Sequence, residues 1–173
     1  ALLADKIGVP RQYQTFAKKL VSLAKQHLVG VPLSGGGGAP IDDDQVWLDL
    51  VEHFDLLDDI PQGDWDVDEE EFLEYGLAWS LKLLKQSILE SPTMIDYDDM
   101  IYMPLYSNLR FWQYEWVLID EAQDTNLARR EIAKRLLRPS GRLIAVGDRH
   151  QAIYGFTGAS ANALDLIEDE FQC

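Results

Sequence analysis

The sequence has almost no cysteine, no long apolar run and no export signal. Its single cysteine, Cys173, cannot form a disulfide within the chain, which favours a reducing, intracellular setting. No apolar run approaches the roughly 20 residues that cross a bilayer, and the N-terminus lacks the basic, apolar and small-residue pattern of a signal peptide. We therefore expect a cytoplasmic protein, or a nuclear one in a eukaryote.

Positive charge is scarce as well. The chain has 15 lysines and arginines against 30 acidic residues, a net charge of −15, so it lacks the overall basic character typical of nucleic-acid-binding proteins. Most of the acidic residues lie between Asp42 and Asp99, and a more basic stretch follows them. That asymmetry indicates an acidic part facing water or another part of a longer protein, followed by a basic-to-neutral part. The basic residues of the later part are Arg129, Arg130, Lys134, Arg135, Arg138, Arg142 and Arg149.

The sequence also contains no Gly-x-x-x-x-Gly-Lys-Ser/Thr loop, the motif whose backbone amides and lysine bind nucleotide phosphates. The glycine-rich segment Ser34–Pro40 lacks the Lys-Ser/Thr pair and any preceding strand. Its composition predicts a flexible linker, either natural or an engineered bridge that replaces a longer segment. The chain begins without methionine, and we expect it to be an internal part of a longer protein.

Helical spacing of apolar residues dominates the first part of the chain. It predicts helices over 11–28, after the acidic run Asp42–Asp44, over 69–90, and from a cap at Asp96 to about Tyr106. We expect 112 onward to enter a β-strand.

Charged residues on these helices have more than one interpretation. Lys18, Lys19 and Lys25 could contact a DNA backbone, but a solvated helix face is the favoured interpretation. The run Asp42–Asp44 lacks the alternating oxygen ligands and distal glutamate of a calcium loop, so it is interpreted as a helix start. A structural role is also favoured for three later acids: Asp96, Asp98 and Asp99.

Two apolar runs farther along the chain, Trp116–Ile119 and Leu143–Val146, each lead into acidic residues. Buried parallel strands have this pattern when they present a site at their carboxyl ends. Helical spacing over Asn126–Leu137 connects the two runs, and a last helix is expected over Ala161–Glu170. The unit is therefore predicted to be strand, helix, strand, with a right-handed crossover and both acidic ends on one edge of a sheet.

The carboxylates Asp120 and Glu121 follow the first of these strands. Magnesium takes one or two protein carboxylates besides water and phosphate oxygens, so Asp120 fits the metal-binding position. Glu121 points elsewhere and could orient or deprotonate a water molecule that attacks a terminal phosphate. The alternative is that the pair only caps the following helix.

Two motifs in this region closely resemble those of the UvrD/Rep-like family of superfamily 1 DNA helicases. Asp120–Thr125 has the form of its Walker B motif, Asp-Glu-x-Gln-Asp-Thr. Gly147–Ala159 has the form of its motif III, Gly-Asp-x-x-Gln-x-Ile-Tyr-x-Phe-x-Gly-Ala. A weaker resemblance lies in Ile95–Met100, which is similar to the segment that precedes Walker B in the family. The two main motifs, in this order and spacing, are highly specific.

The resemblance implies a role for each matching residue. Asp120 would hold the magnesium ion of ATP, Glu121 would be the catalytic base, and Gln151 would sense the γ-phosphate and connect it to the DNA track. Tyr154 and Phe156 would lie near single-stranded DNA. An aromatic ring can stack on any base, which supports Phe156 in particular. The alternative for both aromatic residues is ordinary core packing.

The chain departs from the family pattern at Thr157, where arginine is common, and this removes a cation from the expected DNA interface. The phosphate loop and any match to the second motor domain are also missing from the sequence. We therefore expect the 173-residue chain alone to be inactive as an ATPase and helicase.

The expected fold class is α/β: part of a RecA-like P-loop NTPase motor domain with parallel strands and flanking helices, preceded by a mostly helical subdomain. Residues 1–111, with the glycine-rich linker 34–40, would form the helical subdomain, which resembles the family's insertion, and 112–173 would form the motor part. The implied function is that of part of an ATP-dependent DNA helicase or translocase. It would couple Mg-ATP hydrolysis to movement on single-stranded DNA, together with the remaining motor domains of the parent chain.

Two other functions remain open at this stage. One is a non-enzymatic DNA- or protein-binding module that keeps a degenerate helicase fold. The other, a magnesium nuclease, is weaker, because the acids occur beside Gln151 and the aromatic residues rather than beside further acids.

Overall fold

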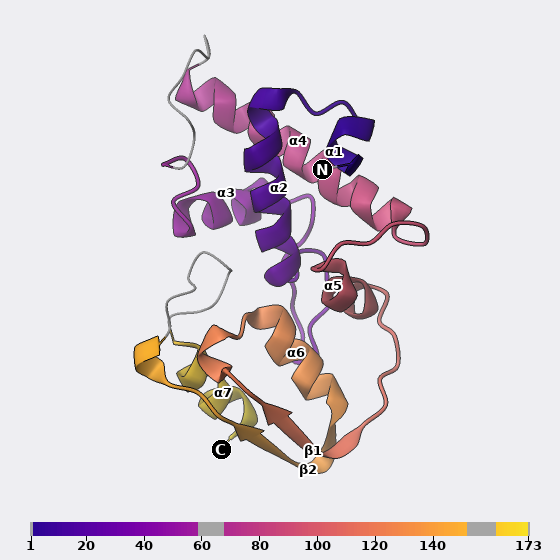
Figure 1. Ribbon diagram of the computed structural model, residues 1–173, viewed down its shortest axis with the longest axis vertical. Helices are drawn as coiled ribbons and strands as arrows, with labels where there is room; N and C mark the ends of the chain where they lie inside the picture. Colours follow the sequence, from indigo (N-terminus) through magenta and orange to yellow (C-terminus); the bar gives the residue numbers. More distant parts are fainter. Residues whose placement is uncertain (1, 59–67, 152–161, 173) are drawn as a thin grey trace.

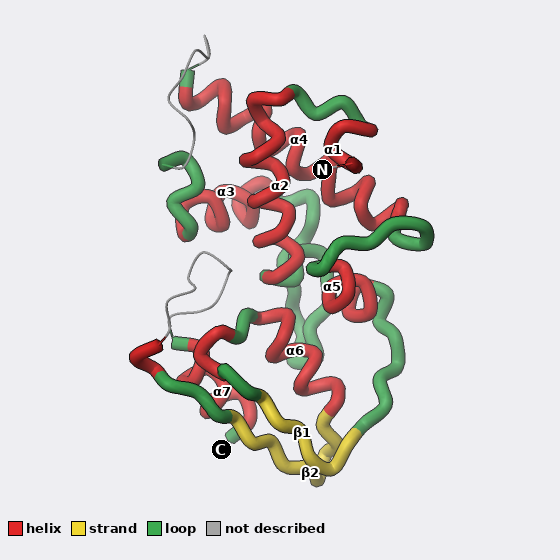
Figure 2. Tube along the Cα trace, viewed as in Figure 1, coloured by secondary structure: helices red, strands yellow, loops and turns green. Residues whose placement is uncertain are grey.

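The computed structural model describes residues 2–58, 68–151 and 162–172. Helices α1 to α5 gather at one end, and two strands with α6 and α7 form the other end (Figures 1 and 2). None of the described helices is long and apolar enough to span a membrane. The elements in chain order are α1 (Leu2–Lys6), α2 (Arg11–Gln26), α3 (Asp44–His53), α4 (Glu69–Glu90), α5 (Asp99–Tyr106), β1 (Tyr114–Ile119), η1 (Ala122–Asp124), α6 (Leu127–Leu136), β2 (Leu137–Ala145), η2 (Arg149–Gln151) and α7 (Ala163–Phe171).

Helix α4 has the bounds that its apolar spacing predicts. Asp68 caps it by accepting a hydrogen bond from the Glu71 backbone N–H at 2.8 Å, and the acidic first turn suits the helix dipole. Its apolar face packs on α2. A Cβ added at Gly76 would lie 2.7 Å from the Phe16 ring, so the glycine permits the close approach of the two helices. The core between the helices includes Phe16, Ala17, Leu20, Ala24, Trp47, Phe72 and Leu84.

Lys25 contradicts the expectation of a solvated or DNA-facing lysine. Its side chain is only 1% exposed and makes ion pairs with Asp96 at 2.7 Å and Asp99 at 2.8 Å. Asp99 is equally buried, and its carboxylate also lies 3.4 Å from the Ser87 hydroxyl. The lysine lies at the end of α2 that faces α5, so its charge is used to join two helices.

The start of α5 also differs from the prediction. The helix begins at Asp99 and not directly after Asp96. Asp96 nevertheless caps it, because its carboxylate accepts the Asp99 backbone N–H at 2.8 Å, and the Asp99 carboxylate accepts the Asp96 N–H at 3.0 Å. The two bonds have the reciprocal pattern of a capping box, although the residue directly before the helix is Asp98, whose side chain makes no capping bond. The structural interpretation of Asp96 and Asp99 is therefore supported.

The glycine-rich segment is more than a flexible linker. The Leu33 and Gly36 N–H groups donate to the carbonyls of Gly37 and Leu33, which closes a turn, and Gly36 and Gly37 have positive φ angles of 83° and 82°. The Ser34 backbone N–H and hydroxyl both donate to the buried carboxylate of Glu131, each at 3.0 Å. One end of the segment is thus fixed to α6.

The expected strand, helix, strand unit is present. Strands β1 and β2 pair in parallel, with Val117 opposite Leu143 and Ile119 opposite Ala145. Strand β2 is longer than predicted, because it begins at Leu137 directly after α6 and passes through Pro139 and Gly141 with an irregular register. That stretch has no alternating apolar pattern, so its sequence gives no sign of a strand.

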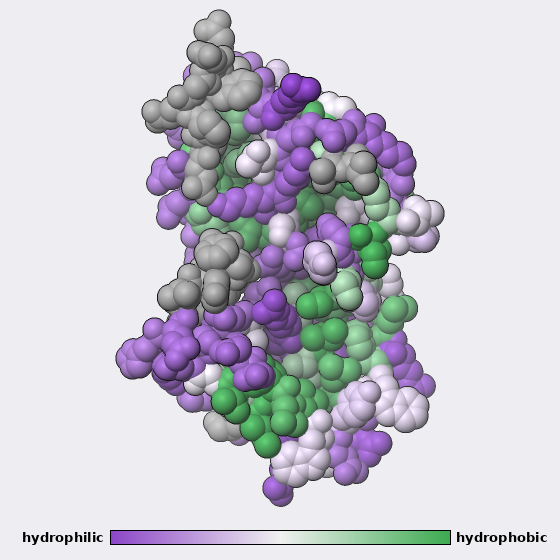
Figure 3. Space-filling model, in the orientation of Figure 1, coloured by the Kyte–Doolittle hydropathy of each residue, from purple (hydrophilic) through white to green (hydrophobic). Residues whose placement is uncertain are grey.

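The prediction that both strands are buried is wrong for the described part of the chain. Helices α6 and α7 contact the strands, but the other face remains open, with Leu118 71% exposed and Val146 60% exposed. Figure 3 shows apolar side chains gathered over the strands. Alternate residues of β1 share this open face, and the exposed apolar set is Tyr114, Trp116, Leu118, Ile144 and Val146.

Candidate functional site

The acidic ends of the two strands meet on one edge of the sheet. Pairing continues past the strand ends, because the Val146 N–H donates to the Ile119 carbonyl at 2.8 Å and the Ala122 N–H donates to the Val146 carbonyl at 2.9 Å. Asp120 and Glu121 follow β1 on this edge, and Gly147 and Asp148 follow β2. We call residues 120–124 and 147–151 the rim. The rim therefore joins the two sequence motifs at the carboxyl ends of parallel strands, as predicted.

Glu121 occupies an unusual backbone conformation. Its φ of 49° and ψ of 48° lie in the left-handed region, which non-glycine residues seldom adopt. Its backbone N–H donates to the Asp120 carboxylate at 3.0 Å, and its own carboxylate accepts from the Gln123 amide at 2.8 Å. Such strained residues cluster at functional sites, where the surrounding structure holds them in place.

The carboxylate pair does not cap α6. The cap is Asn126, whose side-chain oxygen accepts the Arg129 N–H at 3.0 Å. Asp120 and Glu121 are exposed, and neither side chain caps the short helix η1. The capping interpretation of the two acids is therefore wrong, and both remain accessible for chemistry.

Gln123 connects the two halves of the rim, a role that the sequence interpretation did not identify. This buried amide donates to Glu121 through Nε2 at 2.8 Å and accepts the Asp148 backbone N–H through Oε1 at 3.0 Å. Gly147 permits the close approach, because an added Cβ would lie 3.0 Å from both the Ala122 and Gln123 backbone nitrogens. The signal was available, since Gln123 is the glutamine of the Asp-Glu-x-Gln-Asp-Thr motif.

Gln151 reaches the rim from the short helix η2. Its side-chain amide donates to the Asp148 carboxylate at 2.9 Å, and the other oxygen of that carboxylate accepts the His150 backbone N–H, also at 2.9 Å. These bonds, with the His150 N–H first, hold the pKa of Asp148 below its usual value. Asp148 is therefore ionised at neutral pH and orients the amide of Gln151 on the same edge as Asp120 and Glu121.

Tyr154, Phe156 and Thr157 lie outside the described residues. Helix α7, which follows them in the chain, is joined to the rim by Arg149. This arginine makes ion pairs with Asp165 at 2.6 Å and Glu168 at 3.2 Å, both on α7.

The acids of the weaker motif lie away from the rim. Asp98 accepts hydrogen bonds from the Ser22 hydroxyl at 2.5 Å and from the Gln26 amide at 3.2 Å. The Gln26 side-chain oxygen accepts in turn from Asn126 at 3.2 Å. Asp98 thus helps to hold the helical part against the start of α6, in agreement with a structural role.

The donor chemistry of the rim fits a magnesium ion bound with nucleotide phosphates. Asp120 offers exposed carboxylate oxygens, the hard ligands that magnesium prefers. In the described parts of the chain, no group of three or more metal-ligating side chains converges. Magnesium sites commonly use only one or two protein carboxylates, completed by water and phosphate oxygens.

A parallel strand, helix, strand unit preceded by helices, with Asp-Glu and Gly-Asp at adjacent strand ends, has the architecture of part of a RecA-like domain. A comparison with known protein families identifies the family to which this domain belongs. The model of the UvrD/REP helicase N-terminal domain family matches residues 54–172, and the chain belongs to this family.

Several helicases are similar to the chain over roughly half of its length. A probable DNA helicase of Mycoplasma pneumoniae is 35% identical over 95 residues, which cover 50% of this chain and 18% of the relative. The ATP-dependent DNA helicase Rep of Buchnera aphidicola subsp. Schizaphis graminum is 33% identical over 111 residues, which cover 60% of this chain and 16% of the relative. Rep of Escherichia coli is 35% identical over 91 residues, which cover 48% of this chain and 14% of the relative. The chain thus spans only a small part of each relative's length.

Proposed function

We propose that this chain is part of the first motor domain of an ATP-dependent DNA helicase that couples Mg-ATP hydrolysis to movement on single-stranded DNA. In this proposal, residues 112–173 belong to the motor domain and 1–111 to a helical subdomain inserted into it. One observation carries the proposal: Gln123 bonds to Glu121 of the first motif and to Asp148 of the second, at 2.8 and 3.0 Å. A nucleotide at the rim would therefore contact two motifs that are already connected.

Each rim residue has a role in this proposal. Asp120 holds the magnesium ion, which would supply charge neutralisation for the phosphates, and Glu121 accepts a proton from the attacking water. The Gln123 amide holds the Glu121 carboxylate in position. Gln151 contacts the terminal phosphate, and Asp148 orients its amide. Tyr154 and Phe156, in the part of the chain that is not described, would contact the DNA strand.

The test is ATP hydrolysis by the longer protein that contains this chain, with and without single-stranded DNA. We expect DNA to raise the rate many-fold and Glu121→Gln to lower it by about 10²–10⁴, the usual contribution of a general base. Nucleotide binding should persist, because the variant keeps the magnesium ligand. The matched control Glu52→Gln changes an exposed glutamate of α3 and should leave the rate unchanged.

The second candidate is a binding module without catalysis, which keeps a degenerate helicase fold; the absence of a phosphate loop from the longer protein would favour it. If the longer protein binds DNA but shows no DNA-dependent hydrolysis, this second function replaces the first. By contrast, rapid turnover by the 173-residue chain alone would contradict our expectation that it is inactive in isolation.

A further inference from the structure

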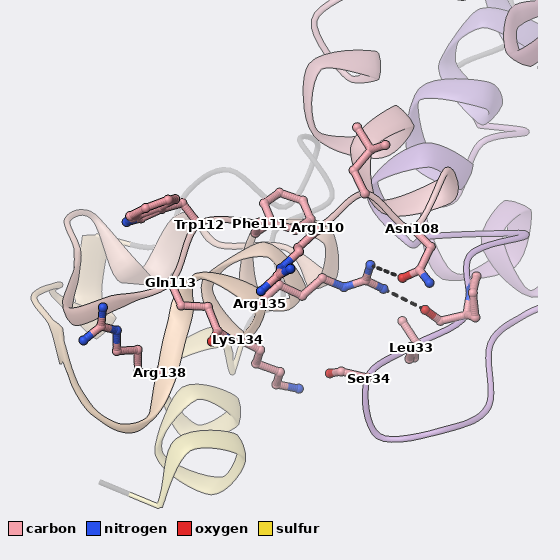
Figure 4. Close-up of a pocket in the computed structure, with 12 residues that line it drawn as sticks. Leu33, Ser34, Asn108, Arg110, Phe111, Trp112, Gln113, Lys134, Arg135 and Arg138 are labelled. Atoms are coloured by element: carbon pink, nitrogen blue, oxygen red, sulfur yellow. Dashed lines mark hydrogen bonds between the residues drawn. The ribbon is translucent and has the colours of Figure 1, made fainter.

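A groove of about 1100 Å³ lies at the amino ends of the two strands, opposite the rim. Three segments line it: 32–34 of the glycine-rich loop, 108–113 before β1, and 134–138 where α6 passes into β2. Because the strands are parallel, residues that precede both of them lie at the sheet edge away from Asp120 and Asp148. Figure 4 shows the side chains of the three segments around this common space.

The groove is basic in a strongly acidic chain. Its described lining contains Arg110, Lys134, Arg135 and Arg138 and no acidic side chain, although the whole chain carries a net charge of −15. Three of these cations pair with acids that lie outside the lining, so the positive charge that attracts an anionic partner is carried mainly by Arg110.

The four cations are not equivalent. Arg135 is held on the groove wall, since it donates to the Pro32 carbonyl at 2.9 Å and the Asn108 side chain at 3.1 Å (Figure 4). It also makes an ion pair with the buried Glu131 at 3.0 Å. Lys134 makes an ion pair with Glu170 at 3.0 Å. Arg138 and its partner Glu115 are both exposed, so a new anion can replace that partner at little cost.

Of the four cations, Arg110 makes the fewest polar contacts with the described part of the protein. It is exposed, and no ion pair or hydrogen bond joins its side chain to the described part of the protein. The neighbouring indole of Trp112 is 77% exposed and also lines the groove. A tryptophan gains little free energy from folding in such a position, whereas an exposed flat ring that lines the same groove as cations suits a partner that has both phosphates and flat rings.

We propose that this groove binds single-stranded nucleic acid, with phosphates on Arg110 and Arg138 and a base stacked on Trp112. It would form a contact separate from the one expected at Tyr154 and Phe156. The combination of cations with an exposed aromatic ring favours nucleic acid over an acidic peptide, which has no base to stack. The proposal adds to the DNA-binding function above but does not depend on ATP hydrolysis.

The test measures binding of a fluorescein-labelled 15-nucleotide oligothymidylate to the 173-residue chain by fluorescence anisotropy over a range of salt concentrations. Arg110→Glu should weaken binding at least about tenfold, as expected for loss of a charge-assisted contact. Arg110→Ala should lower the slope of log affinity against log salt by about 0.7, because one phosphate contact is lost. The control Arg11→Glu makes the same charge change at an exposed arginine at the start of α2 and should have little effect.

The stacking part of the proposal has its own test. Trp112→Ala should weaken binding of the oligothymidylate at least about fivefold, and Trp112→Phe should restore most of the loss. With an abasic oligonucleotide of the same length, Trp112→Ala should have no effect, because no base is available. Circular dichroism of each variant establishes that the fold is retained.

Three results would overturn the proposal. Equal losses for Arg11→Glu and Arg110→Glu would mean that only overall charge matters. A labelled polyglutamate peptide that binds as tightly as the oligonucleotide, with the same dependence on Arg110, would make the partner an acidic protein. An unchanged affinity in Trp112→Ala would mean that no base stacks on that ring. None of these results depends on the rim residues, so none of them would contradict the proposal of ATP hydrolysis.

Discussion

Replacing Lys25 with methionine should destabilise the protein strongly, because the change leaves a buried acid without its counter-ion. Methionine keeps most of the apolar stem but removes the ammonium group that pairs with Asp96 and Asp99. Asp99 is 2% exposed and would remain as an unpaired buried charge or would have to be protonated. Breaking a buried pair on one side costs about 3–5 kcal/mol, a large share of the 5–15 kcal/mol that stabilises a typical domain.

Asp96 has a different environment from Asp99. Burial pushes the pKa of Asp96 up, but the hydrogen bonds from Lys25 and the Asp99 backbone N–H, together with the charge of Lys25, outweigh burial and hold that pKa below its usual value. The Asp96 side chain is also largely exposed, so water can solvate it once the lysine is removed. Most of the loss in Lys25→Met should therefore come from Asp99.

The assay is urea denaturation followed by circular dichroism, with the free energy of unfolding compared between variants. The double variant Lys25→Met/Asp99→Asn removes both buried charges and should recover much of the loss. As a matched control, Lys85→Met removes an exposed lysine that pairs with Asp42 and should cost less than about 1 kcal/mol. The reasoning fails if Lys25→Met costs no more than Lys85→Met, or if the double variant is less stable than Lys25→Met.

Two further predictions concern the rim and a partly buried histidine. Gly147→Ala should destabilise the protein by about 1–3 kcal/mol, because its methyl group would crowd the backbone of Ala122 and Gln123. The measurement is thermal melting, with Gly35→Ala as the control, because a Cβ added at Gly35 has nothing within 4 Å and should change the melting temperature little. Equal changes in the two variants would contradict this account. Burial, with smaller contributions from the charges of His53 and Arg130, lowers the pKa of His27 to about 4 from 6.5. The unfolded chain then binds more protons than the folded protein between these two pH values, so the free energy of unfolding should fall by about 3 kcal/mol as the pH drops from 6.5 to about 4. His27→Gln should flatten this part of the plot of unfolding free energy against pH, measured by urea denaturation. An unaltered plot would refute the assignment to His27.

Local patterns in the sequence predict the elements that local interactions determine. The bounds of α4 follow from a long apolar period, an acidic first turn and the cap at Asp68. The shared edge for Asp120 and Asp148 follows from two apolar runs around a helix, because that order predicts parallel strands. In both cases the residues that carry the information are neighbours in the chain.

The features that the sequence does not predict depend on distant partners. Lys25 pairs with an aspartate 71 residues away, so no local pattern distinguishes it from a solvated lysine. Arg135 donates to the Pro32 carbonyl 103 residues away, and this contact forms one wall of the groove. The left-handed backbone of Glu121 also lies beside a distant contact, because the N–H of the next residue, Ala122, donates to the Val146 carbonyl at 2.9 Å.

The helical part and the rim are connected through one side chain at the start of α6. Asn126 caps that helix with its oxygen and donates through its nitrogen to Gln26, which also bonds to Asp98. Asn126 directly follows the Walker B motif, so the segment that carries Asp120 and Glu121 is hydrogen-bonded to α2 directly, and to the start of α5 through Gln26. A rotation of the helical part relative to the strands must break these bonds or move the Walker B segment with it, which gives the two parts of the chain a direct physical coupling.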